Sequence, residues 1–181
     1  MERRVAIRPV ERTDAFRAIS VAERSLSAER RQWIGLAIVA LVAVAADQIT
    51  KHVVASSIAL DHAVKLFGPF SIHHVQNSGI AFGLFSRATV VVIVLTTVAV
   101  VWMLVFFARS GARHPALPVA LGLLIGGSVS NLVDRVRLGY VTDFLDLRWW
   151  PAFNLADASI VVGVAVLLGS LLLSDSSAPR S

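Results

Sequence analysis

Four stretches of this chain are long and apolar enough to cross a lipid bilayer, and they limit its fold more than any other feature. They cover residues 33–54, 88–108, 115–133 and 156–173. A spanning helix needs about 17–25 mostly apolar residues, because the hydrocarbon core is about 30 Å thick. The span is helical because hydrocarbon offers no partner to an unpaired backbone polar group. At 56% hydrophobic residues, the chain also exceeds the soluble range of about 45–50%. The sequence therefore predicts an integral membrane protein.

The segment between the first two apolar stretches has a different pattern. "HAVKLF" and "FSIHHVQN" are separated by Gly68-Pro69, which predicts two short strands joined by a turn. The stretch "NSGIAFGLFS" that follows is apolar but interrupted by glycines, which is typical of a loop or strand at the membrane surface. The predicted fold is an all-α membrane protein of four transmembrane helices, with a small extracytoplasmic β region at about residues 56–87.

The distribution of basic residues predicts the orientation in the membrane. If the N-terminus is cytoplasmic, eleven of the seventeen Lys and Arg residues lie on the inner side, eight of them before residue 32. Loops rich in Lys and Arg stay on the cytoplasmic side of a membrane, so both termini are expected in the cytoplasm. We divide the chain into a flexible extension at 1–32, a membrane domain at 33–173 and a tail at 174–181. The extension holds few aromatic residues among its arginines, and no nucleic-acid partner is expected.

This topology brings polar residues from distant parts of the sequence to one depth. Asp47 lies near the outer end of the first helix, Asn131 and Asp134 near that of the third, and Asp157 at the start of the fourth. Acidic side chains at the edge of hydrocarbon are costly and usually functional. Convergence of such groups inside a helix bundle is typical of an active site.

The first and third helices carry further polar residues beside these acids. Asp47 and Lys51 are four residues apart, a spacing that favours an ion pair, and such a pair has a purely structural explanation as well. In "GGSVSNLVDRVRLGYVTDF", Asn131, Asp134 and Arg135 share one helix face, and we expect Asp134 to pair with Arg135. Gly126 and Gly127, in the same stretch, predict close approach of a neighbouring helix.

Asp143 and Asp157 are the best candidates for acid–base chemistry. Asp143 has no basic residue at helical spacing, although Arg148 lies within reach along the loop, and Asp157 precedes a long apolar helix. Asn154 has the position of a helix N-cap, which is an equal alternative to a role in a site. Two carboxyls held close together share one proton, so that one accepts a proton from water while the other donates. That is aspartic-protease chemistry.

Other hydrolytic chemistries lack the residues that they need. The chain has no cysteine, which excludes disulfides, thiolate metal sites and a thiol nucleophile. There is no H-E-x-x-H zinc motif, and no G-x-S-x-G motif surrounds Ser128 or Ser130. We therefore expect neither a metal nor another cofactor.

Five blocks follow one another within about residues 35–172: "DQITKHVV", "NSGIAFGLF", "GGSVSNLVDR", "GYVTDF" and "PAFNLADASIVVG". In sequence and order they resemble those of the lipoprotein signal peptidase (signal peptidase II) family. The resemblance implies an aspartyl endopeptidase of the bacterial cell membrane with an extracytoplasmic β-cradle. It would cut prolipoproteins before the diacylglyceryl-modified cysteine, close to the extracytoplasmic face of the cell membrane. Its expected partners are these substrates and membrane lipid, and the chain is expected to be a monomer.

By the same resemblance, Asp143 and Asp157 match the two catalytic aspartates of the family. The positions that match its recurrent supporting residues are Asp47, Lys51, Asn77, Gly79, Asn131, Asp134, Arg135 and Asn154. The glycine-broken segment offers Phe82, Leu84 and Phe85 to line a lipid or signal-peptide path, and an apolar interfacial loop is an equal explanation for them.

Two alternative functions use the same acids. A CDP-alcohol phosphatidyltransferase needs a G-x-x-x-D fragment, which Gly139 and Asp143 supply, but Asp146 follows three residues later where four are required. A small ion or proton transporter would need polar groups through the midplane of several helices. Here the second span offers only Thr96-Thr97, and the fourth has no polar residue at its centre.

Overall fold

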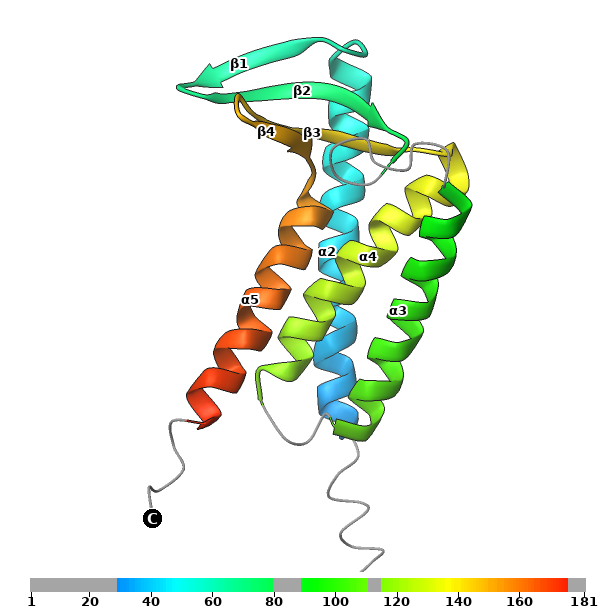
Figure 1. The fold of residues 1–181 in the computed structure, drawn as a ribbon, viewed down its shortest axis with the longest axis vertical. Helices are drawn as coiled ribbons and strands as arrows, with labels where there is room; N and C mark the ends of the chain where they lie inside the picture. Colours follow the sequence, from blue (N-terminus) through cyan, green and yellow to red (C-terminus); the bar gives the residue numbers. More distant parts are fainter. Residues whose placement is uncertain (1–28, 80–88, 111–114, 176–181) are drawn as a thin grey trace, which may run out of the picture.

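A computed structural model of the chain describes residues 29–79, 89–110 and 115–175, and Figure 1 shows its elements. The helices are α2 (Arg30–Ser57), α3 (Thr89–Ser110), α4 (Leu117–Leu138) and α5 (Leu155–Asp175). The strands are β1 (Ala63–Phe67), β2 (Phe70–Asn77), β3 (Val141–Leu147) and β4 (Trp150–Phe153). All four helices are long and apolar enough to cross a membrane, which confirms the predicted spans.

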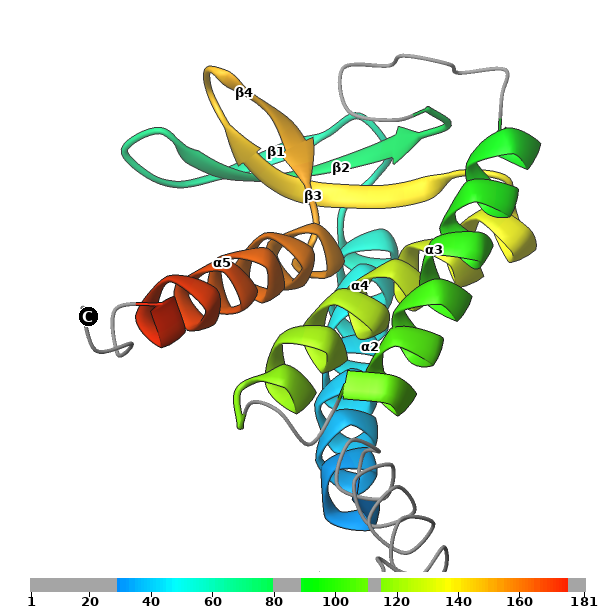
Figure 2. The same cartoon turned by 60° about the horizontal axis from the view of Figure 1, so that its bottom comes forward.

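The helices form a bundle with α4 at its centre. Helix α4 packs against α2, α3 and α5, while the strands lie across one end of the bundle (Figures 1 and 2). The start of α2 and the end of α5 lie at the opposite end. Burial agrees with the central position of α4. In its candidate span 61% of the residues are buried, against 11–17% in the other three spans. The remaining helices expose apolar faces, as expected of helices in contact with lipid.

Small residues on α4 allow its neighbours to come close. A Cβ atom added to Gly126 would lie 2.7 Å from the carbonyl oxygen of Ala40 on α2. A Cβ atom on Gly127 would overlap the carbonyl oxygen of Ala156 in the first turn of α5. Both glycines therefore lie at helix contacts, as the sequence predicts, and Gly127 sets the distance from α4 to the helix that carries Asp157.

The strands form one antiparallel sheet in the order β1-β2-β3-β4. The β1–β2 hairpin confirms the strand pair predicted from the sequence. The second hairpin was missed: no strand was predicted between the third and fourth spans, and Arg148 was placed in a loop. In the sheet, β3 pairs with β2, and Asp143 lies opposite Val75. Its residues Val141 to Phe144 are buried, so this strand lacks the alternation of polar and apolar residues that marks a half-exposed strand.

Helix α4 continues about one turn beyond the predicted end at residue 133. It ends at Leu138, and the cap residue Gly139 has the left-handed φ of 83° and donates its N–H to the carbonyl oxygen of Arg135 at 3.1 Å. Glycine is suited to this position because it has no Cβ to clash. The longer helix keeps Asp134 and Arg135 on a rigid element, and the chain then turns back as β3.

The contact at Gly127 gives a stability prediction. We expect Gly127→Ala to destabilise the protein by about 1–3 kcal/mol, because the new methyl group must push α5 away from α4. The measurement is the thermal unfolding midpoint of the purified protein in detergent.

The matched control is Gly169→Ala in α5, where an added Cβ meets no heavy atom within 4 Å. This substitution should leave the unfolding midpoint unchanged or slightly higher. Equal effects of the two substitutions would contradict the close packing of α4 against α5.

Candidate active site

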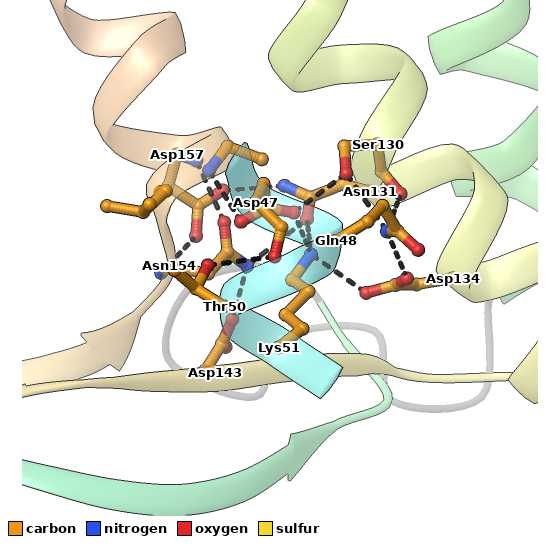
Figure 3. Close-up of polar contacts among 12 residues, drawn as sticks. Asp47, Gln48, Thr50, Lys51, Ser130, Asn131, Asp134, Asp143, Asn154 and Asp157 are labelled. Atoms are coloured by element: carbon orange, nitrogen blue, oxygen red, sulfur yellow. Dashed lines mark hydrogen bonds and ion pairs between the residues drawn. The ribbon is translucent and has the colours of Figure 1, made fainter. Parts of the chain in front are cut away.

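Asp143 and Asp157 lie around the side chain of Asn154, although they come from different kinds of element (Figure 3). Asp143 is on β3, and Asp157 is in the first turn of α5. Asn154 donates its side-chain Nδ2 to Asp143 Oδ1 at 2.6 Å and its backbone N–H to Asp157 Oδ2 at 3.3 Å. One residue therefore fixes the two carboxyls relative to each other.

Every oxygen of the two carboxyl groups accepts a hydrogen bond from an N–H group. Besides the two donors of Asn154, Asn77 donates Nδ2 to Asp143 Oδ2 at 2.9 Å. Asn131 donates Nδ2 to Asp157 Oδ1 at 2.8 Å. Buried carboxyls need such partners, and four fixed donors restrict the rotation of both groups. The two acids are therefore held in place before any substrate arrives.

Asn154 has both of the roles that its position in the sequence left open. Its Oδ1 accepts the backbone N–H of Asp157 at 2.9 Å, which is an N-cap bond. Its side chain is fully buried, and its Nδ2 also reaches Asn131 Oδ1 at 3.1 Å. The same amide thus begins α5 and connects Asp143 to Asn131.

A buried ion cluster lies beside the two acids. Lys51 Nζ lies 2.6 Å from Asp47 Oδ2 and 2.8 Å from Asp134 Oδ2, and it donates to Asn131 Oδ1 at 2.9 Å. The predicted pair of Asp47 and Lys51 is confirmed. The predicted pair of Asp134 and Arg135 is wrong: the partner of Asp134 is Lys51, since adjacent residues on a helix point about 100° apart.

Asp47 connects this cluster to the start of α5. Its Oδ1 accepts the backbone N–H of Ala156 at 2.9 Å, and its Oδ2 accepts the hydroxyl of Ser130 at 2.7 Å. The first N–H groups of a helix have no partner within the helix, and a carboxylate there is favourable. Asp47 is fully buried, so it acts as a fixed anchor for the turn that carries Asp157.

Two residues of this network were missed as site residues. Gln48 donates Nε2 to Asp134 Oδ1 at 2.8 Å and to Ser130 Oγ at 3.0 Å. Ser130 is fully buried and was considered only as a nucleophile. The spacing of Ser130 from Asp134, one helical turn, is a signal that both residues face the same neighbour. Which residue of α2 they meet depends on how the helices pack.

Asn77, Gly79 and Arg135 form a second side of the site. The backbone N–H of Gly79 donates to Asn77 Oδ1 at 3.0 Å, which orients the amide that bonds Asp143. Arg135 donates to the carbonyl oxygens of Gly79 at 3.1 Å and Asn131 at 3.3 Å. The guanidinium group therefore attaches the end of β2 to α4, and all ten predicted site residues lie in one connected region.

A cavity of about 640 Å³ opens onto the two acids. Its polar lining includes Asn77, Asn131, Arg135, Asp143 and Asp157. The rest of the lining is mainly apolar and comes from β3, β4 and one face of α5. Among the residues that the structure describes, no three His, Asp or Glu side chains are grouped to hold a metal ion.

Burial raises the pKa of the Asp143 carboxyl to about 6. The hydrogen bond from Asn77 opposes this shift, the negative charge of Asp157 adds to it, and Asn154 and Lys51 oppose it more weakly. Arg148 lies instead at the turn between β3 and β4, where its N–H donates to the carbonyl oxygen of Pro69. Burial and the amide donors therefore bring the pKa of the Asp143 carboxyl near neutral pH.

Some sequence predictions concern residues outside those that the structure describes. Phe82, Leu84 and Phe85 lie in the undescribed segment 80–88. The undescribed segments also include residues 1–28 and 176–181, which hold most of the predicted N-terminal extension and C-terminal tail.

Comparison with known proteins gives one consistent match. A family model described as "Signal peptidase (SPase) II" matches residues 39–173. The lipoprotein signal peptidase of Moorella thermoacetica is 39% identical over 137 residues, covering 75% of this chain and 91% of the relative. That of Symbiobacterium thermophilum is 40% identical over 141 residues, covering 75% and 93%. These matches favour the peptidase over the phosphatidyltransferase and the transporter.

The fold has a solved counterpart. A bacterial membrane enzyme determined by the in meso method at 2.3 Å is similar with a TM-score of 0.77 and 26% identity. The similarity covers 86% of this chain and 96% of that one.

The raised pKa of Asp143 predicts a pH-dependent stability. The folded value of about 6 lies above the ordinary 3.8, so the stabilising contribution of the bound proton is present below pH 3.8 and is lost as the pH rises to about 6. The loss is on the order of 3 kcal/mol. Asp143→Asn cannot ionise, so its stability relative to the wild type should increase between pH 4 and 7.

The measurement is the thermal unfolding midpoint in detergent across that pH range. The control is Asp61→Asn, at an exposed position whose φ of 60° suits asparagine as well as aspartate. A difference between wild type and Asp143→Asn that stays constant with pH would contradict the assigned pKa.

Proposed function

Because this chain belongs to the signal peptidase II family, we propose that it cleaves prolipoproteins with Asp143 and Asp157 as its catalytic pair. The family makes the chain an aspartic-type peptidase and a multi-pass protein of a bacterial membrane. The cleaved bond in this proposal is the one before the diacylglyceryl-modified cysteine, so that the signal peptide is removed.

One observation supports this assignment above the others: two acids on different elements are held by amide donors at the same cavity. Asp143 and Asp157 both line the cavity of about 640 Å³. The surrounding cluster of Asp47, Lys51 and Asp134 is already paired internally and has its own structural role. Asp143 and Asp157 are the acids whose partners are mainly neutral amides, and neutral donors leave a carboxyl free to change its protonation state.

The proposed reaction needs one proton shared by the two carboxyls. The ionised member takes a proton from a water molecule while the oxygen of that water attacks the carbonyl carbon of the scissile peptide. The protonated member donates its proton to the carbonyl oxygen, which gives a neutral tetrahedral intermediate. When the C–N bond breaks, the carboxyl that gained the water proton passes it to the leaving amine, and the gem-diol returns a proton to the other carboxyl. The pair therefore ends with the single proton that it had at the start.

The position of the site fits a substrate anchored by lipid. Helix α2 has 28 residues and is about 42 Å long, which is longer than a hydrocarbon core of about 30 Å. Asp47 is 17 residues beyond Arg30, so it lies roughly 26 Å along this helix. In this proposal the acids lie at the boundary of the core, where a peptide bond next to a lipidated cysteine is found.

The proposal also includes an orientation. In the sequence, eleven of the seventeen basic residues precede or begin α2, lie from the end of α3 to the start of α4, or follow α5. Those helix ends lie at the end of the bundle opposite the sheet. We place that end in the cytoplasm, following the positive-inside rule. The sheet and the two acids then face the extracytoplasmic side.

The catalytic assignment predicts large losses of activity. Asp143→Asn and Asp157→Asn should each reduce kcat for a lipidated prolipoprotein by at least about a hundredfold, because acid–base catalysis contributes about 10²–10⁴-fold. The measurement is cleavage by purified protein reconstituted in lipid, with thermal unfolding used to show that both variants fold.

The matched control is Asp146→Asn, on the same strand as Asp143 but bonded to Ser71 at 3.3 Å and outside the cavity. It should retain nearly full activity, and cleavage should survive a metal chelator. Full activity in Asp143→Asn or Asp157→Asn would remove that residue from the mechanism. Loss of cleavage in Asp146→Asn together with sensitivity to the chelator would instead favour a metal-dependent site that includes Asp146.

The orientation predicts which residues react with a membrane-impermeant thiol reagent. The chain has no cysteine, so single substitutions report one position each. Ala59→Cys, in the exposed connection from α2 to β1, should be labelled on intact spheroplasts. Pro115→Cys, exposed before α4, should be labelled only after the membrane is opened. The reverse pattern would place the sheet in the cytoplasm.

A further inference from the structure

Two turns of the sheet lie together and form an exposed aromatic surface that the catalytic proposal does not use. The turn between β1 and β2 exposes 68% of Phe67 and 42% of Phe70, whose rings are 5.1 Å apart. The turn between β3 and β4 exposes 73% of Trp149. The N–H of Arg148 donates to the carbonyl oxygen of Pro69 at 3.4 Å, which joins the two turns. We call these residues, together with Lys65, the hairpin tip.

The hairpin tip also carries two basic residues at one small cleft. Lys65 and Arg148 both line a cleft of about 220 Å³ beside Ser71. Within the described part of the chain, neither has a carboxylate within 4 Å of its charged group. The nearest acid along the sheet is Asp146, which accepts the Ser71 hydroxyl and lies 3.6 Å from His73 Nδ1. The cleft therefore has the composition of a site for an anionic group.

The aromatic and basic groups are arranged in the order of a membrane interface. In the sheet register, Phe70 lies opposite Leu147, which lines the large cavity and therefore faces the bundle. Lys65 lies opposite Ser71, one position along, so it points to the other face of the sheet. Phe67 pairs with Phe70 and so shares its inner face, while Lys65 lies on the outer face. This order matches a bilayer, where acyl chains lie inside the phosphate layer.

The hairpin tip also lies at a suitable depth. Asp143 is fixed to the first turn of α5 through Asn154, so β3 crosses the bundle at the end of the α5 span. Arg148 follows five residues later, roughly 16 Å along the strand. Figure 1 shows the two hairpins extending sideways over the α5 side of the bundle rather than upward along its axis. The polar interfacial layers add only about 10–15 Å in total to the core, and the hairpin tip lies within reach of one of them.

We propose that the hairpin tip inserts Phe67, Phe70 and Trp149 into the lipid interface and holds the phosphate of an anionic phospholipid between Lys65 and Arg148. Tryptophan is enriched at this boundary, and phenylalanine is found on the apolar side of interfacial segments. Each basic residue near the surface favours anionic lipid. The attachment would hold the open edge of the sheet against the membrane beside the cavity. It does not depend on the catalytic assignment of Asp143 and Asp157.

The first test measures the depth of Trp149. A protein with Trp33, Trp102 and Trp150 each replaced by Phe keeps Trp149 as its single tryptophan. In bilayer nanodiscs, its fluorescence should be quenched strongly by phospholipids brominated near the carbonyl end of their acyl chains. The control carries His62→Trp, at an exposed position next to the top of α2, with all four native tryptophans replaced by Phe. It should be quenched much less. Absence of quenching of Trp149 would overturn the insertion and favour a water-exposed or protein-binding surface.

The second test measures lipid preference. In an equimolar mixture of phosphatidylcholine and phosphatidylglycerol, bromine carried only by phosphatidylglycerol should quench Trp149 at least about twice as strongly as bromine carried only by phosphatidylcholine. The double substitution Lys65→Gln and Arg148→Gln should make the quenching by the two lipids equal. The double substitution Lys65→Arg and Arg148→Lys should keep the difference. Equal quenching by both lipids in the wild-type cleft would overturn the anionic site.

Discussion

The site depends on one buried ammonium group with three acceptors. Lys51 is 5% exposed, and its three N–H groups match Asp47, Asp134 and Asn131. A buried charge without such partners is strongly destabilising, so these acceptors must be present wherever Lys51 is buried. Since Asp47 is on α2 and Asp134 on α4, their shared cation fixes the rotation of each helix relative to the other.

This fixed geometry reaches both candidate catalytic acids through neutral amides. Asn131 accepts from Lys51 and Asn154 with its oxygen and donates to Asp157 with its nitrogen, so its orientation is determined. Asn154 is oriented in the same way, because its oxygen accepts the backbone N–H of Asp157 and its nitrogen donates to Asp143. Amides transmit position without adding charge. The ionised cluster therefore supports the acids while leaving amides as their direct contacts, as acid–base chemistry near neutral pH requires.

The sequence predicted the parts of this structure that depend on local pattern. Apolar length located the spans, and a Gly-Pro turn between two β-rich stretches located the first hairpin. The second hairpin was missed because Val141 to Phe144 are buried on both faces and lack alternation. The partner of Asp134 was mistaken for Arg135, and Gln48 was missed, because partners across helices depend on packing that no spacing within one helix reveals.

In this chain a strand, and not a second helix, places Asp143 beside the helix that carries Asp157. Gly139 caps helix α4, and a strand that returns across the bundle brings Asp143 over the first turn of α5 only four residues later. The backbone groups of β3 are paired with β2, so this non-helical segment satisfies its hydrogen bonds beside the membrane. Peptide hydrolysis consumes water, which the hydrocarbon core does not supply. In the proposed reaction, an acid pair at the end of the spans would have access both to water and to a lipid-anchored substrate.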